Sequence, residues 1–234
     1  MSAHLRDHWQ LLVLVVLVVV LWSTPLIFPL KTLVIFFHEG AHGLAAILTG
    51  GRIEEISVNP NHGGHAVTVG GNPFLIISAG YLGSLLIGMM LFWGALKTRL
   101  DRVFMAILGG LLILLAVLYI REMFPFLFAV GVGAAFLATA RYLRAEISDL
   151  ALRVIGLSSM IYVPLDIFDD TIRRSGGRSD ARILAEHFGG PTLFWGVIWL
   201  VFSLVAVFWA LRRSIAHPTN ISLTGRTNAP PGSG

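Results

Sequence analysis

Residues 36–42 read Phe-Phe-His-Glu-Gly-Ala-His and lie within an apolar segment that runs from residue 32 to residue 51. On a helix, His38 and His42 are one turn apart, so both imidazoles leave the same face and can hold one metal ion. Glu39 lies beside them, where it can act on a metal-bound water instead of binding the metal. Ionisable groups at membrane depth are costly and usually functional. The segment therefore predicts a membrane helix that carries part of a metal site. The alternative is a histidine pair that only packs against neighbouring helices.

The composition is that of an integral membrane protein with several spans. Of the 234 residues, 56% are hydrophobic and only 13% are charged, and the mean hydropathy is +0.79. A soluble domain has about 25% charged residues. The net charge of +4 suits loops that contact anionic lipid headgroups, so we expect the bilayer, and no nucleic acid, as a partner. Because the chain has no cysteine, disulfides, thiolate ligands and a cysteine nucleophile are excluded.

Seven apolar segments approach the length of about 20 residues that a membrane-spanning helix needs. They cover residues 11–30, 32–51, 73–96, 103–120, 123–140, 150–170 and 191–211. The first is longer than the apolar core of a signal peptide, so we expect a retained helix. The predicted fold is thus an all-α polytopic membrane protein with about seven transmembrane helices.

Between and beyond these helices the sequence predicts irregular structure. Pro164 is expected to interrupt the sixth helix, and residues 171–190 are expected to form a loop. One transmembrane domain is predicted for residues 1–216. The tail at residues 217–234, rich in Pro, Gly, Asn and Thr, is predicted to be disordered.

Residues 52–71 differ from the rest of the chain. Apolar and polar residues alternate on both sides of a dense turn signal at residues 59–64, which predicts a β-hairpin. An open strand edge cannot face lipid, so the hairpin must lie at the interface or against the helices. Its edge could pair with an extended peptide, or the hairpin could be a plain connection, and the sequence favours neither. His62 and His65 are expected to be exposed loop histidines rather than ligands.

A catalytic zinc usually has three protein ligands and a water, so two histidines leave one ligand to find. Counting crossings places the end of the sixth helix on the same membrane face as the end of the metal-motif helix. Asp166 is the deepest carboxylate there and is the preferred third ligand, with Asp169 or Asp170 as alternatives. The three could also be solvated aspartates, or could pair with Arg173 and Arg174.

Four stretches match motifs of one known family. They are His38-Glu39-Gly40-Ala41-His42, the glycine-bounded hairpin at residues 52–71, Ala79-Gly80-Tyr81-Leu82-Gly83, and Pro164-Leu165-Asp166. The chain thereby resembles the site-2 protease family of intramembrane zinc metalloproteases, most fully over residues 33–88.

The second motif departs from the family pattern. The family has an Asn before the Pro and Leu-Asp-Gly after it, whereas here no matching Asn precedes Pro164, and Ile167 stands in place of the Gly. The stretch at residues 166–170, followed by Ser179-Asp180-Ala181, is more similar to a divergent branch of small M50B-like membrane proteins.

Residues and resemblance together predict an intramembrane zinc metalloprotease, an endopeptidase of the site-2 protease type. It would hydrolyse peptide bonds of membrane-embedded protein substrates by means of a zinc-activated water. His38, His42 and Asp166 would hold zinc, and Glu39 would be the catalytic base. Two rival functions are a transporter of metal ions or protons, whose histidines and carboxylates line a path, and an inactive membrane scaffold.

Overall fold

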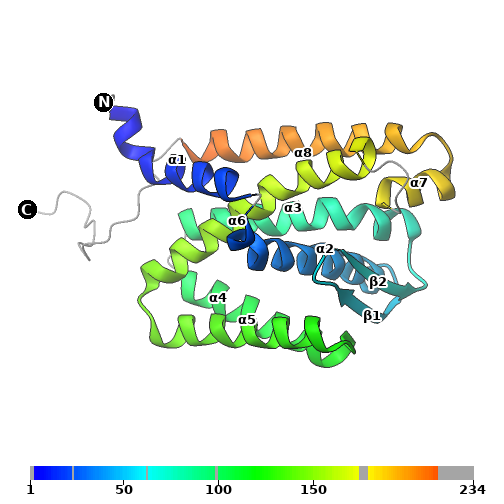
Figure 1. The fold of residues 1–234 in the computed structure, drawn as a ribbon, viewed down its shortest axis with the longest axis horizontal. Coiled ribbons are helices and arrows are strands. Elements are labelled where there is room, and N and C mark those ends of the chain that lie inside the picture. The colour runs from blue at the N-terminus through cyan, green and yellow to red at the C-terminus, as the bar shows by residue number, and fades with distance from the viewer. Residues whose placement is uncertain (1–2, 23, 62, 98–99, 174–178, 216–234) are drawn as a thin grey trace, which may run out of the picture.

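The computed structural model describes residues 3–22, 24–61, 63–97, 100–173 and 179–215 (Figure 1). The elements, in chain order, are α1 (Ala3–Leu21), the 3-10 turn η1 (Pro25–Ile27), α2 (Phe28–Leu48), β1 (Arg52–Val58), β2 (Gly64–Val69), α3 (Pro73–Lys97), α4 (Asp101–Tyr119), α5 (Met123–Tyr142), α6 (Ala145–Phe168), the π-helical turn η2 (Asp169–Arg173), α7 (Asp180–Phe188) and α8 (Thr192–Ser214). The all-α polytopic class with one hairpin is confirmed.

The number of spans is five or six rather than seven. Among the described residues, α3, α4, α5, α8 and α6 with η2 are long and apolar enough to cross a membrane. The first two predicted spans, α1 and α2, form a pair bent by 113° and count as a sixth span only if they are one broken helix. Proline explains the bend, since Pro25 and Pro29 stand in the first turns of η1 and α2 and cannot continue a preceding helix.

Two expectations about the sixth segment are wrong. Helix α6 begins earlier, at Ala145, and runs through Pro164 without a break. A proline removes one helical hydrogen bond, and here the buried neighbours Val163 and Ile167 keep the segment packed.

The expected loop at residues 171–190 contains the amphipathic helix α7. The predicted tail at residues 217–234 lies outside the described residues.

Helix α3 packs against α2 on one side and α6 on the other through small residues. A Cβ on Gly83 would strike Ala41 of α2. On the α6 side, a Cβ on Gly156 would lie 2.7 Å from the Gly88 carbonyl oxygen. The backbones approach so closely because small residues meet, the usual device for joining helices where lipid supplies no hydrophobic driving force.

The hairpin lies against the metal-motif helix, and its two strands differ in burial. In β1, Ile56 and Val58 are fully buried, and Ile53 occupies the space that a Cβ on Gly43 of α2 would need. The Ser57 hydroxyl donates a 2.6 Å hydrogen bond to Glu122 at the start of α5. The outer strand β2 pairs antiparallel with β1 and is largely exposed. The hairpin and α7 lie at the same end of the bundle (Figure 1).

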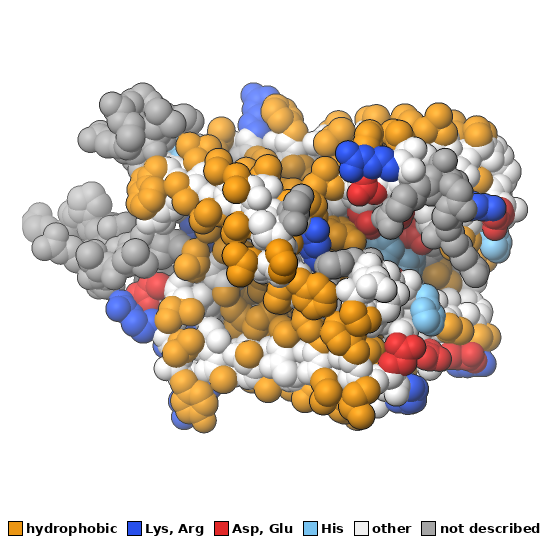
Figure 2. Space-filling model, viewed as in Figure 1, with side chains coloured by type: hydrophobic (Ala, Val, Ile, Leu, Met, Phe, Trp, Pro, Cys, Tyr) orange, Lys and Arg blue, Asp and Glu red, His pale blue; other side chains and the backbone are white. Residues whose placement is uncertain are grey.

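Apolar side chains cover much of the visible surface, as Figure 2 shows, while acidic and histidine side chains gather near the end that holds the hairpin and α7. Large exposed apolar residues are common on α4 and α8. This distribution is that of a protein whose outer face contacts lipid and whose ionisable groups are kept inside or at the ends.

We predict that Gly156→Ala lowers the free energy of unfolding by about 1–3 kcal/mol, because the added methyl group overpacks a backbone contact that cannot give way. The measurement is the thermal-unfolding midpoint of the purified protein in detergent. Gly131→Ala is the matched control, since no described atom lies within 4 Å of its Cβ position. Equal midpoints for the two variants would contradict this account of α3–α6 packing.

Candidate metal centre

Helix α2 presents His38 and His42 on one face, as the one-turn spacing predicts. The two rings are 4.8 Å apart between centroids and stand nearly edge to face. His42 is buried, and Glu39, which follows His38, is only 5% exposed. The segment after Pro29 is mostly apolar and has no further proline, and the helix ends at Leu48, with Thr49 as its C-cap before the positive φ of Gly50.

Asp180, the first residue of α7, completes a group of three. Its Oδ2 lies 3.1 Å from His38 Nε2 and 3.3 Å from His42 Nε2. One ligand atom from each of the three residues lies within 4.8 Å of the other two. Among the described residues this is the group that could hold a metal ion.

Local structure fixes where the Asp180 carboxylate points. Ser179 is the N-cap of α7, and its hydroxyl accepts a hydrogen bond from the backbone N–H of Arg182. Burial acts to raise the pKa of the Asp180 carboxyl, but His42 and His38 outweigh burial and hold that pKa well below its ordinary value. The carboxylate is therefore anionic, which is the form that binds a cation.

A second contact orients His42. Its Nδ1 lies 2.7 Å from the carbonyl oxygen of Ile76 in α3. A carbonyl only accepts hydrogen bonds, so Nδ1 carries a proton, and Nε2 is the nitrogen left to bind a metal. The orienting partner comes from the backbone of a different helix, which ties the site to the α2–α3 packing.

Gly80 of α3 provides the clearest test of whether a metal fits. A Cβ built on Gly80 would lie 2.5 Å from both His38 Nε2 and Asp180 Oδ2, and as close to His42 Nε2. All three donor atoms thus converge against the face of Gly80, where any larger residue would collide with them. The donors are two imidazoles and one carboxylate, the ligand types of catalytic zinc, whose bonds are about 2.0–2.2 Å long. The residues present fit a zinc ion.

A cavity of about 890 Å³ opens beside this group. Its walls come from α2, β2, α3, α6 and α7, and its polar lining includes Glu39, His65, Asp166, Asp170 and His187. Such a cavity can bring water to a site that lies among membrane helices.

Glu39 lies against the hairpin. A Cβ on Gly64 of β2 would come within 2.6 Å of Glu39 Oε1. The strand therefore passes directly over the carboxylate, and Gly64 leaves it room. His65, the next residue, is exposed as expected from the sequence, but it belongs to strand β2 and not to a loop, whereas His62 lies outside the described residues.

The structure brings Asp180, rather than Asp166, to the two histidines. Asp166 and Asp170 do line the same cavity, so counting crossings placed the end of α6 at the correct face. Asp170 Oδ2 accepts a 2.9 Å hydrogen bond from Tyr81, and Asp169 accepts one of 3.1 Å from Arg173.

Sequence reasoning missed Asp180 because residues 171–190 were interpreted as a loop. The available signal was Ser179-Asp180 before a short amphipathic stretch, since a serine followed by an acidic residue is typical of a helix start. A helix start placed there would have added Asp180 to the candidate ligands.

Fold and site together define an integral multi-pass membrane protein with a candidate metal centre of two histidines and an aspartate between its helices. A family model described as Peptidase M50B-like matches residues 11–210. The chain belongs to this family, which confirms its membership of the site-2 protease group that the motifs suggested. None of the curated proteins and none of the solved structures matches the chain.

We predict that Gly80→Ala strips the metal while the protein stays folded, because the new methyl group would occupy the point where the three donor atoms converge. Zinc per protein, measured by inductively coupled plasma mass spectrometry, should fall at least tenfold. A tenfold weaker affinity corresponds to a loss of about 1.4 kcal/mol in binding free energy. Gly110→Ala in α4 is the control, as nothing described lies within 4 Å of its Cβ position. A Gly80→Ala protein with full zinc would mean that the metal lies elsewhere.

Proposed function

We propose that the protein is an intramembrane zinc metalloprotease that hydrolyses peptide bonds of membrane-embedded protein substrates. One observation carries the proposal: His38, His42 and Asp180 direct their donor atoms to one point above Gly80, and Glu39 lies beside it in a cavity that water can fill. Membership of a peptidase family supports the same conclusion.

In this proposal His38, His42 and Asp180 hold zinc, and Asp166 does not. Zinc, when bound, supplies a Lewis acid that makes water a stronger nucleophile at neutral pH and polarises a carbonyl oxygen. The three residues come from two helices, α2 and α7, so the site forms only when α7 is docked on the bundle. Asp166 would instead keep the cavity polar and hydrated.

Glu39 is the proposed general base. It is buried next to the two histidines, lines the cavity, and is not part of the three-residue donor group. It would take a proton from the attacking water and later give that proton to the leaving amine. Gly64 of β2 lies close to its side chain, since a Cβ there would come within 2.8 Å of Glu39 Cγ, so the strand limits how far the carboxylate can turn away.

Strand β2 is the proposed binding edge for the substrate backbone. The backbone N–H of Asn59 donates to the Gly63 carbonyl oxygen, which makes that pair a hydrogen-bonded one. Bonded and non-bonded pairs alternate along an antiparallel ladder, so the N–H groups of Gly64, Ala66 and Thr68 point away from β1. All three residues line the cavity. A substrate helix that is locally unwound could add there as an extended strand.

We predict that Asp180→Ala lowers zinc content and proteolysis together, whereas Asp166→Ala keeps zinc near wild-type occupancy. Asp180 has an oxygen close to both histidine Nε2 atoms, and loss of one of three ligands leaves a weak site. Metal analysis of both purified variants is the measurement. Loss of zinc from Asp166→Ala with zinc retained by Asp180→Ala would reverse the assignment.

We predict that Glu39→Gln retains zinc and loses proteolysis by about 10²–10⁴-fold, the usual contribution of general acid–base catalysis. The amide has nearly the same size, and the donor group is untouched. The assay is cleavage of labelled transmembrane peptides in proteoliposomes. Glu54→Gln, at an exposed position of β1, should keep wild-type activity. Proteolysis that survives in Glu39→Gln would exclude this mechanism, and metal transport without proteolysis in the wild type would favour the transporter.

We predict that Ala66→Pro weakens substrate handling and leaves zinc in place, because proline removes an outward-facing N–H without removing a bond of the β1–β2 ladder. The expected result is a higher KM for a helical substrate. Val67→Pro removes a ladder bond instead and should disturb the hairpin itself, which circular dichroism and limited proteolysis can detect. Unchanged kinetics in Ala66→Pro with an ordered hairpin would contradict edge pairing.

A further inference from the structure

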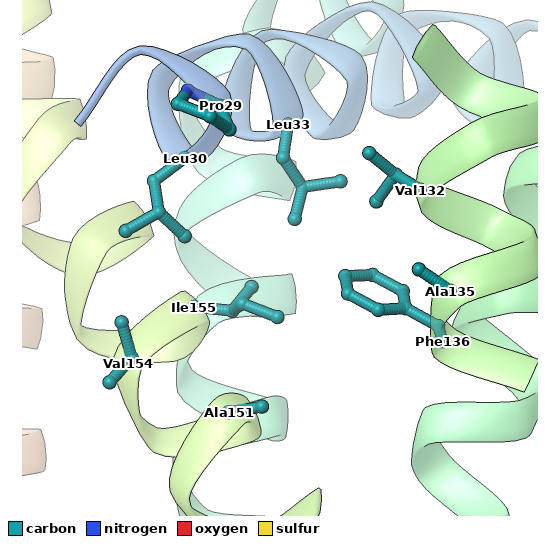
Figure 3. A pocket seen from close by; sticks show the side chains of 9 residues that line it. All are labelled: Pro29, Leu30, Leu33, Val132, Ala135, Phe136, Ala151, Val154 and Ile155. Atoms are coloured by element: carbon teal, nitrogen blue, oxygen red, sulfur yellow. The ribbon is translucent and has the colours of Figure 1, made fainter. Parts of the chain in front are cut away.

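A second cavity lies away from the metal centre, between α2, α5 and α6. Its volume is about 370 Å³. Figure 3 shows side chains from the three helices directed into it. None of its described lining residues carries a polar side chain; they are Pro29, Leu30, Leu33, Val132, Ala135, Phe136, Ala151, Val154 and Ile155.

The cavity is a crevice that opens towards the lipid rather than a closed void. Leu33 and Ile155 are buried and form its floor, while Pro29 and Ala135 are exposed at its rim. It exists because α5 is joined closely to α4, where a Cβ on Gly133 would lie 2.7 Å from the Gly109 carbonyl oxygen. Since α5 is fixed to α4 in this way, the space on its other side is left unfilled.

Basic residues surround the connection between two of the helices that form the walls. Arg141 and Arg144, at the end of α5 and just before α6, are both exposed, as is Arg102, whose Nη2 donates to the Leu143 carbonyl oxygen. Three carboxylates lie at the same end: Glu146 pairs with Arg144 at 3.1 Å, Asp149 pairs with Arg153 at 2.6 Å, and Asp101 is buried beside Arg102. Tyr142, 79% exposed, is a residue typical of the membrane interface.

The distances along the helices from the arginines to the crevice agree with the dimensions of a phospholipid. Arg141 follows Phe136 by five residues and Arg144 precedes Ala151 by seven, which is roughly 8 and 11 Å along a helix at 1.5 Å per residue. One leaflet of the hydrocarbon core is about 15 Å deep. A lipid whose phosphate contacts the arginines would therefore place the upper part of an acyl chain in the crevice.

Charge beside the crevice favours a phospholipid over an apolar helix as its occupant, since Arg141 and Arg144 are exposed next to a lining of apolar side chains. We propose that the crevice between α2, α5 and α6 is a binding site for one anionic phospholipid, with an acyl chain in the crevice and the phosphate at Arg141 and Arg144. This site is independent of the proposed proteolytic function.

The test uses the full chain in nanodiscs that contain equal amounts of phosphatidylglycerol and phosphatidylcholine. Native mass spectrometry after release counts the retained lipids. The wild type should retain one phosphatidylglycerol in preference to phosphatidylcholine. The double variant Ala135→Phe/Ala151→Leu, which fills the crevice, should lose both lipids. Ala134→Phe, on an exposed neighbouring position of α5, is the control for added bulk.

The headgroup contact is tested separately with Arg141→Gln/Arg144→Gln. The preference for phosphatidylglycerol should fall about 30-fold, the factor expected from two arginine contacts near the surface, while phosphatidylcholine is still retained. Arg212→Gln changes an exposed arginine in the last turn of α8 and should have no such effect. An unchanged thermal-unfolding midpoint in detergent shows that each variant is folded.

Two results would overturn the proposal. The first is equal lipid retention by the wild type and the crevice-filling variant. The second is a crevice-filling variant that retains its lipid but loses cleavage of a transmembrane substrate, which would make the crevice a contact for the substrate helix. Because lipid retention is measured without proteolysis, failure of the lipid proposal leaves the proposed protease activity untouched.

Discussion

The contact between the Asp180 carboxylate and the two histidines of α2 is the interaction on which the site depends. Three ionisable groups meet among membrane helices, where each alone would be costly. The carboxylate lies 3.1 Å from one imidazole and 3.3 Å from the other, so attraction offsets part of that cost before any metal binds. In the proposed metal site, a cation between the three would be held by the anionic carboxylate and the two imidazoles.

The other elements can be understood from this contact. Helix α3 supplies Gly80, which leaves room for the ion, and the Ile76 carbonyl oxygen, which fixes the His42 ring. The small residues of α3 set its distance from α2 and α6, and hence the size of that room. The hairpin has two tasks: β1 packs its buried isoleucines and valine on α2, while β2 passes over Glu39 and offers an open edge to the cavity.

Much of this arrangement follows from the sequence. Apolar segment lengths identify the membrane helices, alternation around a turn identifies the hairpin, and His38 with His42 gives two of the three donors. Asp180 was not predicted as a metal ligand because it belongs to a nine-residue helix that lies outside the membrane spans. Its position depends on how α7 docks on α3 and α8. Pro25 and Pro29 stand where α1 and α2 separate, but only the structure shows the size of the bend there, 113°, which turns two expected spans into one bent pair. Small residues such as Gly80 and Gly64 predict close packing in general, and only the three-dimensional structure shows which atoms approach them.

The most direct test of the central claim is a crystal structure of the zinc-loaded protein with anomalous diffraction recorded at the zinc edge. We expect one strong anomalous peak above Gly80, at about 2.0–2.2 Å from His38 Nε2, His42 Nε2 and an Asp180 oxygen. A peak that is bound by Asp166 instead, or by the histidines without any carboxylate from α7, would contradict the account.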